Sequence, residues 1–243
     1  MSKEKIIIFG GNGFVGTHIA EQLVHLDCLP ICVSRSGVMP LQLSGISWAK
    51  EVEWLKGDAL KPDMNLMNDA TAVITLIGSA PVPTFSNSAY QKQFFMNSEP
   101  NISVIKAVSA SSVQRLVVLG AHVPKVIRGS MFAYVKGKIV TADATKAFVE
   151  ISPNHSAVLL EPTAIYGTRF TKSGKPLNIA AVMSPIAKLQ SLVPNIIKKI
   201  LPETLVSVNA VANSAARVCL DESYAGNYTC LSNQKIIEMN EQV

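Results

Sequence analysis

The stretch KIIIFGGNGFVG, residues 5–16, decides the fold that we predict for this chain. It begins with the apolar run IIIF, which is typical of a parallel strand that is buried on both faces. The chain then turns through glycines, with Gly10, Gly13 and Gly16 at intervals of three residues. Apolar residues at helical spacing follow as far as about Leu26. This order predicts a strand, a tight glycine turn and a helix.

A glycine turn in this position is suited to binding a phosphorylated nucleotide. Its backbone can approach a pyrophosphate closely, and the N-terminus of the following helix offers unpaired N–H groups and a partial positive charge. We therefore predict that a dinucleotide binds at the turn and the first helical residues, namely Gly10, Asn12, Gly13, Phe14, Val15 and Gly16. The alternative is a turn whose glycines serve only the packing of the backbone.

The residues at the end of the second predicted strand bear on the choice of cofactor. That strand is PICVS, residues 30–34. An acidic side chain at its end would bond the ribose 2′-hydroxyl of NAD. The chain instead has Ser34, Arg35 and Ser36 there, and a guanidinium presents a bidentate fork to phosphate oxygens. We therefore expect NADP rather than NAD, the alternative being a surface arginine in a loop.

The composition indicates a folded α/β protein. The chain has 243 residues, of which 48% are hydrophobic and 16% charged, and its mean hydropathy is +0.28. These values suit one domain in which helices cover both faces of a sheet. No apolar run reaches the length of a transmembrane helix, and no signal peptide is visible before the first strand. We expect a cytoplasmic protein, or a mitochondrial, membrane-associated one if the numbering follows removal of a transit peptide.

The charge and the cysteines exclude some classes of function. The net charge of +5 and the pI of about 9.0 fit a protein that binds phosphorylated cofactors, an anionic membrane surface or nucleic acid. No Lys/Arg block and no aromatic stacking pattern supports nucleic acid, so we expect none as a partner. A mildly basic, solvated surface is the simpler explanation. The four cysteines lack the spacing of a zinc or redox site, so we expect reduced thiols and no metal.

Further apolar runs predict the remaining strands of the sheet, at residues 51–55, 71–78, 115–120 and 156–160. Ligands in open α/β sheets bind outside the carboxyl ends of the strands, so Ile77 and Gly78 should line the cofactor crevice. Asp58 follows another of these strands. It can accept a hydrogen bond from the adenine amino group or cap the next turn, and the sequence does not distinguish these roles.

Tyr134 and Lys138 lie four residues apart in a segment that becomes helical at about Phe132, so their side chains share one face of the helix. A free phenol has a pKa of about 10, and a nearby ammonium favours the phenolate and lowers that pKa. Such a tyrosine can donate a proton to a carbonyl, or take one from an alcohol, as hydride moves to or from nicotinamide. We predict that this pair is catalytic. The alternative is an exposed helix pair with the tyrosine ring on the core.

The other segments are predicted more coarsely. Two loops are expected, one near the substrate at residues 79–88 and a basic, polar one at 168–176. Helices are expected at 90–112, at 178–200 as two short amphipathic ones and at 210–220, and short strands at 205–208 and 227–231. The 178–200 stretch can cover the core, close over a substrate or rest on a membrane. We predict one nucleotide-binding domain over residues 1–243. Residues 165–205 and 222–243 are expected to form its small substrate-side region.

The motifs occur in the order found in a known superfamily. They are FGGNGFVG, Arg35, Asp58, Asn97, YVKGK around Tyr134 and Lys138, and EPTAIYG at 161–167. Together they resemble the extended and atypical short-chain dehydrogenases/reductases over nearly the whole chain. The resemblance implies a doubly wound, mostly parallel, Rossmann-like α/β fold with a small C-terminal substrate region. It also implies NADP on the glycine turn, Tyr134 as acid/base, Lys138 on the nicotinamide ribose, and cofactor contacts from Asn97 and Pro162.

The chain also departs from the superfamily pattern. A Ser or Thr usual at the end of the fifth strand is replaced by Gly120-Ala121-His122, and Glu161 stands where an Arg is usual. Loss of one such hydroxyl can cost on the order of a hundredfold in rate, and His122 or Ser130 are the candidate substitutes. VSRSG at 33–37, EVEW and GDALKP resemble an atypical group that includes an NADPH-holding accessory subunit of respiratory complex I and a fungal protein associated with coenzyme Q biosynthesis.

Two hypotheses follow for the function. The first is an NADP-dependent oxidoreductase that acts on a carbonyl or alcohol of a small apolar substrate, with a quinone-related compound as the most specific expectation. The second is a non-catalytic NADP-binding scaffold in a membrane-associated complex, which the missing hydroxyl and the amphipathic 178–200 stretch motivate.

Overall fold

A seven-stranded sheet forms the centre of the structure, which is a computed structural model that describes residues 3–82, 84–123, 132–171, 173–178 and 205–241. The strand order is β11-β6-β5-β4-β1-β2-β3, and every neighbouring pair is parallel. The strands are β1 (Lys5–Phe9), β2 (Leu29–Ser34), β3 (Glu53–Lys56), β4 (Ala72–Thr75), β5 (Arg115–Leu119), β6 (Ser156–Glu161) and β11 (Tyr228–Ser232). The order reverses beside β1, as in dinucleotide-binding sheets, and the predicted doubly wound fold is confirmed.

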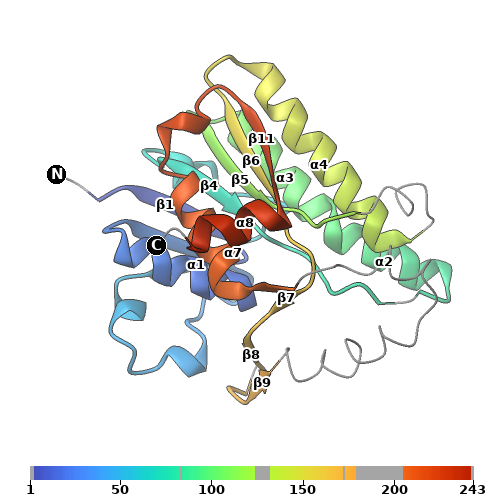
Figure 1. Cartoon of the computed structure of the whole chain (residues 1–243), viewed down its shortest axis with the longest axis horizontal. Coiled ribbons are helices and arrows are strands. Elements are labelled where there is room, and N and C mark those ends of the chain that lie inside the picture. Colours follow the sequence, from blue (N-terminus) through green and yellow to red (C-terminus); the bar gives the residue numbers. More distant parts are fainter. Residues whose placement is uncertain (1–2, 83, 124–131, 172, 179–204, 242–243) are drawn as a thin grey trace.

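Helices cover both faces of this sheet (Figure 1). They are α1 (Phe14–His25), α2 (Asn87–Asn97), α3 (Glu99–Ser109), α4 (Ala133–Ile151), α7 (Val208–Val218) and α8 (Asn233–Glu241), with short 3₁₀ turns η1 (Leu41–Leu43), η2 (Trp48–Lys50), η3 (Met64–Met67) and η6 (Glu222–Tyr224). Helices α1 and α7 pack on one face, and α3 and α4 pack on the other. The glycine turn therefore leads directly from a central strand into a helix of the first layer.

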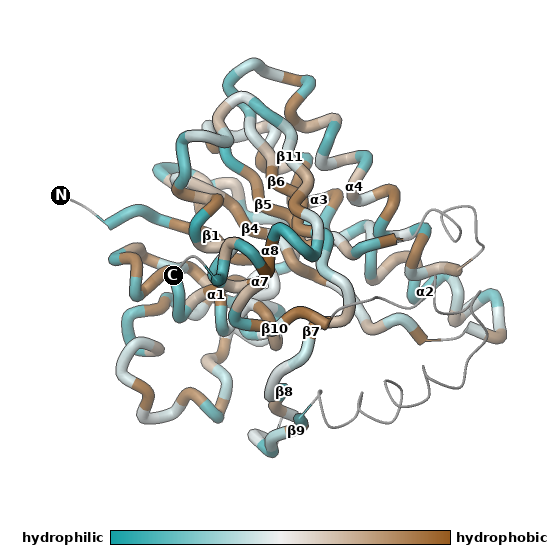
Figure 2. The backbone as a smooth tube through the Cα atoms, viewed as in Figure 1, coloured by the Kyte–Doolittle hydropathy of each residue, from teal (hydrophilic) through white to brown (hydrophobic). Residues whose placement is uncertain are grey.

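Burial on both faces explains why β1 is a continuous apolar run. Ile6 and Ile8 pack in the cluster under α1 and α7, whereas Ile7 and Phe9 pack in the cluster under α3 and α4. All four side chains are at most 1% exposed. A polar residue at any of these positions would be buried without water, so the strand alternates faces without alternating hydropathy. Figure 2 shows hydrophobic segments along the central strands.

Some boundaries differ from the sequence-based prediction. The helical stretch at 90–112 is two helices that meet at Ser98, whose φ of −127° and ψ of −72° are not helical. Pro100 lies in the first turn of α3, where its missing N–H costs no helical hydrogen bond. The strand expected over 71–78 ends at Thr75. Leu76 N still donates to Phe9 O of β1, and from Ile77 onward the peptide groups bond to side chains.

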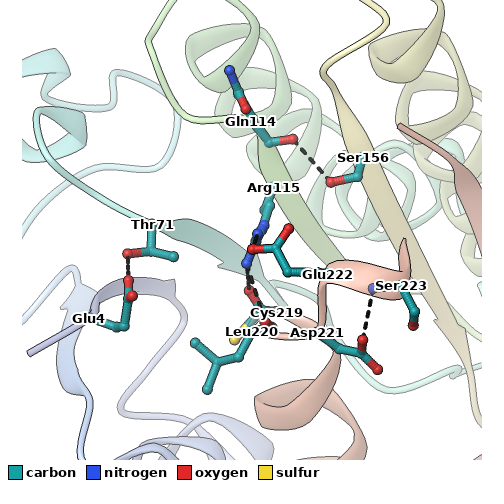
Figure 3. Close-up of polar contacts among 10 residues, drawn as sticks. All are labelled: Glu4, Thr71, Gln114, Arg115, Ser156, Cys219, Leu220, Asp221, Glu222 and Ser223. Carbon is teal, nitrogen blue, oxygen red and sulfur yellow. Dashed lines mark hydrogen bonds and ion pairs between the residues drawn. The ribbon is translucent and has the colours of Figure 1, made fainter. Parts of the chain in front are cut away.

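The C-terminal part of the chain extends the sheet. Strand β11 pairs with β6 and confirms the short strand predicted at 227–231, while the substrate-side role of residues 222–243 stays a prediction. Its apolar residues complete the sheet edge, since Leu231 is buried in the cluster under α7. Arg115, at the start of β5, donates to the main-chain oxygens of Cys219 and Leu220 and pairs with Glu222 (Figure 3). A cation at the end of α7 complements the helix dipole and joins this helix to the sheet.

Two short strand pairs lie outside the main sheet. Strand β7 (Ile165–Tyr166) pairs with β10 (Val206–Ser207), and β8 (Thr168–Phe170) forms an antiparallel hairpin with β9 (Pro176–Asn178) where the sequence predicted a loop. Most of the amphipathic stretch predicted over 178–200 lies outside the described residues. Within the described ranges, no helix combines the length and the hydropathy needed to cross a bilayer.

Candidate active site

A cavity of about 820 Å³ opens at the carboxyl ends of the central strands. Its volume is within the range of about 300–1,000 Å³ that ligand pockets have. Fourteen of the predicted site residues line it: Gly10, Asn12, Gly13, Phe14, Val15, Ser34, Arg35, Asp58, Ile77, Gly78, Asn97, Tyr134, Lys138 and Pro162. The structure therefore brings residues together from five strand ends and three helices. Gly16 and Ser36 are the predicted site residues that do not line this cavity.

The glycine turn forms the floor of the cavity. Gly10 has a φ of 92°, which favours glycine, and Gly13 N donates to Gly10 O at 2.9 Å. Gly13 is also the N-cap of α1, and no side chain caps the helix. The first N–H groups of α1 therefore open toward the cavity, where they can meet an anion.

Gly16 has a packing role, and its predicted contact with a cofactor stays a prediction. A Cβ at this position would lie 2.4 Å from Gly10 O and 2.7 Å from the Cα of Gly11. The absent side chain lets α1 approach the turn closely, which is the third glycine's role in dinucleotide folds.

The end of β2 presents one arginine to the cavity. Arg35 is exposed, lines the cavity and has no ion pair within the described part of the chain. The neighbouring hydroxyls have other partners: Ser36 Oγ accepts from Asn12 Nδ2 at 3.1 Å, and Ser34 Oγ accepts from Gly37 N at 3.1 Å. The serines thus shape the loop, and Arg35 is the group available to a phosphate.

Asp58 caps the turn that follows it, which is one of its two predicted roles. Its Oδ1 accepts from Leu60 N at 3.0 Å, which is a turn cap. The residue also lines the cavity, so a contact with adenine stays a prediction.

Three amide side chains hold the segment that follows β4. Gln93 and Asn97 lie four residues apart on α2, and Asn101 lies on α3; all three are buried and bond to the segment after β4. Asn101 accepts from Ile77 N at 3.2 Å and donates to Ile77 O at 2.8 Å. Gln93 Nε2 donates to Ala80 O at 3.2 Å. These bonds replace strand pairing for residues 77–80 and set the wall of the cavity.

Asn97 belongs to the same row of amides. It is fully buried; its Oδ1 accepts from Ser79 N at 3.1 Å, and its Nδ2 donates to Ser79 Oγ and Gln93 O. Both amide protons are therefore used within the protein. A Cβ on Gly78 would lie 2.8 Å from Asn97 Oδ1, so the glycine allows this approach. Asn97 positions the cavity wall, and its predicted direct contact with a cofactor stays a prediction.

Tyr134 and Lys138 both face the cavity from α4, but they do not interact as predicted. Burial raises the pKa of Tyr134 to about 12, so the prediction that Lys138 lowers it is wrong. Burial also lowers the pKa of Lys138 to about 8, and its Nζ donates to Leu119 O at 2.9 Å. Within the described residues the Tyr134 hydroxyl has no hydrogen-bond partner, so desolvation outweighs the ammonium's attraction.

The end of β5 lacks a hydroxyl beside this pair, as the sequence indicated. Gly120, Ala121 and His122 all line the cavity, and His122 is exposed. The His122 main-chain N–H donates to Pro162 O at 2.8 Å, which places the segment against the end of β6. Ser130, the other predicted substitute, lies outside the described residues.

Although residues 79–81 belong to the loop expected near the substrate, several cavity residues were not singled out individually from the sequence. They are Phe9, Val33, Gly57, Ala59, Leu60, Leu76, Ser79, Ala80, Pro81, Phe95, Met96, Pro100, Leu119, Thr163, Ala164, Ile165 and Arg169. Most are apolar side chains that the fold brings to the strand ends, and no local pattern marks them. Arg169 is different, because it is a cation shortly after the end of β6, and the basic character of residues 168–176 was a usable signal.

Comparison with known proteins gives relatives over part or most of the chain. No family model matches the chain. An uncharacterized, chloroplastic protein of Arabidopsis thaliana is 27% identical over 241 residues, which cover 94% of this chain and 76% of that protein. MIOREX complex component 2 of Saccharomyces cerevisiae is 41% identical over 78 residues, which cover 30% of this chain and only 28% of the yeast protein.

Solved structures match over nearly the whole chain. UDP-N-acetylglucosamine 4-epimerase from Methanobrevibacter ruminantium has a TM-score of 0.68 at 16% identity and covers 96% of this chain and 76% of its own. Gre2 from Candida albicans, in complex with NADPH, has a TM-score of 0.68 at 13% identity and covers 94% of this chain and 78% of its own. Identities this low establish the fold alone. The protein therefore has a Rossmann-like α/β fold, as these solved structures do.

Proposed function

We propose that the protein is an NAD(P)-dependent oxidoreductase that acts on a carbonyl or alcohol of a small apolar substrate, with NADP as the preferred cofactor. One observation carries this proposal: Tyr134 and Lys138 line the same cavity as the glycine turn and Arg35. Such a reaction needs a proton donor and a binding site for the dinucleotide in the same pocket.

The residues of the cavity fit a dinucleotide. The turn at Gly10 and Gly13 and the uncapped N-terminus of α1 would hold the pyrophosphate. Arg35 would bind the 2′-phosphate of NADP, since it is exposed and no acidic residue follows β2 there. When bound, the cofactor supplies or accepts the hydride, and Tyr134 and Lys138 belong to the part of the cavity where the substrate would lie.

The shifted pKa values favour reduction of a carbonyl. With a pKa of about 12, Tyr134 keeps its proton at neutral pH and can donate it to a carbonyl oxygen. Lys138, with a pKa of about 8, is mostly charged at pH 7 and stabilises negative charge that develops near it. Its bond to Leu119 O holds the ammonium at the end of β5.

The lining of the cavity supports an apolar substrate. It consists largely of apolar residues, among them Pro81, Phe95 and Ile165. Burying a hydrophobic ring or chain of a substrate against such a surface contributes favourable free energy to binding. A quinone-related compound is the finer proposal, and it rests on the resemblance of residues 33–62 to an atypical group of the superfamily.

The test is turnover with a matched variant. The full chain is incubated with NADPH and a panel of quinones and ketones, beside Tyr134→Phe and the surface control Tyr90→Phe. The proposal expects oxidation of NADPH that depends on the substrate, is abolished in Tyr134→Phe and is unchanged in Tyr90→Phe. Oxidation that persists unchanged in Tyr134→Phe would contradict the assigned proton donor.

The second candidate function is a non-catalytic, NADP-binding component of a protein complex. The observation that favours it is the absence of a hydroxyl at Gly120 and Ala121, which removes a donor to the reacting oxygen. The name of the yeast relative, a complex component, agrees with it. Tight binding of NADPH with no substrate-dependent oxidation would support this function over the enzyme. A location in an organelle, and contact with a membrane or with protein partners, belong to this second proposal.

A further inference from the structure

Arg169 is a second exposed arginine at the cavity, and it lies on the β8–β9 hairpin. The cavity-lining residues include the cations Arg35, Lys138 and Arg169 and one acid, Asp58. Within the described residues Arg169 has no ion pair. Lys138 donates to Leu119 O, and Arg35 lies at the end of β2, so Arg169 is the cation that the proposed mechanism leaves without a role.

The hairpin reaches across the nucleotide side of the cavity. At its base, a Cβ on Gly167 would lie 3.2 Å from the Cζ of Phe14, the first residue of α1. At its tip, a Cβ on Gly174 would lie 3.6 Å from the Cβ of Leu41, in the loop that follows Arg35. Residues 167–174 of the hairpin thus extend from the N-terminus of α1 toward the loop after β2. Arg169 lies two residues from Gly167, on the side of α1.

The face of the hairpin also fits this placement. Side chains alternate between the faces of a strand, so Arg169 points to the side opposite Thr168 and Phe170. Arg169 lines the cavity, and the hairpin that carries it approaches Phe14 at Gly167, beside the glycine turn. A guanidinium binds phosphate oxygens through paired N–H groups, and it complements the helix N–H groups from the other side.

We infer that Arg169 is a phosphate-binding residue that contacts the pyrophosphate of the dinucleotide opposite the glycine turn. Arg35 then binds the 2′-phosphate, and the two arginines divide the phosphates between them. This inference rests on the proposed nucleotide site. It assigns to the hairpin a direct part in holding the cofactor, separate from any contact with the substrate.

The test is calorimetric titration of the full chain with NADPH, NADH and ADP. The variants are Arg169→Gln, Arg169→Lys and the control Lys175→Gln, which removes an exposed charge from the same hairpin outside the cavity. All three ligands carry the pyrophosphate or its equivalent, so Arg169→Gln should weaken each by about tenfold. Lys175→Gln should change each by less than about twofold, and Arg169→Lys should recover part of the loss.

Three results would overturn the inference. One is unchanged affinity of Arg169→Gln for all three ligands. Another is a loss confined to NADPH, since that places the contact at the 2′-phosphate. The third is an equal loss of affinity in Lys175→Gln, which would show that the total positive charge of the hairpin, and not a contact of Arg169, holds the ligands. If the unmodified protein binds none of the ligands, the proposed function itself fails, and this outcome is distinct from the other three.

Discussion

The Nζ of Lys138 donates a hydrogen bond of 2.9 Å to the main-chain oxygen of Leu119, so the buried ammonium of α4 is held at the carboxyl end of β5. No carboxylate among the described residues pairs with it. Burial without a counter-ion lowers the pKa of Lys138 to about 8, and the charged form is therefore costly in the folded protein. A residue that destabilises the fold at neutral pH is expected at a functional site.

Replacing this lysine should stabilise the protein while removing its activity. Lys138→Met keeps the length of the side chain and removes the buried charge, so the free energy of unfolding at pH 7 should rise by about 1–3 kcal/mol. Chemical denaturation measures the change. The control is Lys136→Met on the same helix, which is expected to change stability by less than about 0.5 kcal/mol.

The stability that Lys138→Met gains over the unmodified protein should disappear at high pH. Between pH 8 and 10.5 the unfolded chain keeps the lysine proton that the folded protein has lost, so the stability of the unmodified protein rises with pH in this window. The difference between the two proteins should therefore shrink from pH 8 upward and be smallest near pH 10.5. A difference that is constant from pH 7 to 10 would show that Lys138 is not held with a lowered pKa.

The pH dependence of reduction should follow Lys138 rather than Tyr134. Because the pKa of Tyr134 is about 12, this residue stays protonated across the working range. The kcat for reduction should be level at low pH and fall as the pH rises through about 8, where Lys138 loses its charge. Tyr134→Phe should lower kcat by about 10²–10⁴ at every pH. A level profile to pH 10 would contradict the role given to Lys138.

The amide row on α2 and α3 should matter for stability. Asn101 is 1% exposed and bonds to both polar groups of Ile77, so Asn101→Leu leaves the half-buried N–H and C=O of Ile77 without these partners. We expect a loss of about 2–4 kcal/mol in the free energy of unfolding, from two such groups. Asn154→Leu, at an exposed position, should cost less than about 0.5 kcal/mol. Equal effects of the two substitutions would show that the row does not hold the segment after β4.

Substitutions of two glycines in the turn should have different effects, one on the stability of the protein and the other on its affinity for the nucleotide. Gly16→Ala places a Cβ 2.4 Å from Gly10 O, so helix α1 must move, and a loss of about 1–3 kcal/mol in stability is expected. Gly13→Ala meets the same oxygen at 3.1 Å, so it should cost less stability and act mainly on nucleotide affinity. Thermal unfolding and NADPH titration of both variants test this. Similar stability losses in the two would contradict the packing role of Gly16.

The sheet could be predicted from the sequence because its strands are locally marked. The apolar runs of β1 and β5 are buried on both faces, and the glycines of the turn follow β1 directly in the sequence. Spacing along a helix also placed Tyr134 and Lys138 on one face. These features depend on residues close in the chain.

The remaining features depend on contacts between distant segments. The path of residues 77–80 after β4 depends on amide side chains of α2 and α3 that bond to their backbone, which no local pattern shows. The pKa of Tyr134 is set by how much of the fold covers it. Arg169 was visible only as part of a basic loop, because its place beside the cavity depends on the hairpin.

The most direct test of the account is the affinity of the protein for NADPH and NADH, measured by titration for the unmodified chain and for Arg35→Ala. Lys50→Ala, exposed in the loop after β2 and outside the cavity, is the control. The account predicts that NADPH binds at least about tenfold more tightly than NADH, that Arg35→Ala removes this difference, and that Lys50→Ala preserves it. Equal affinity for the two nucleotides, unchanged in Arg35→Ala, would contradict it.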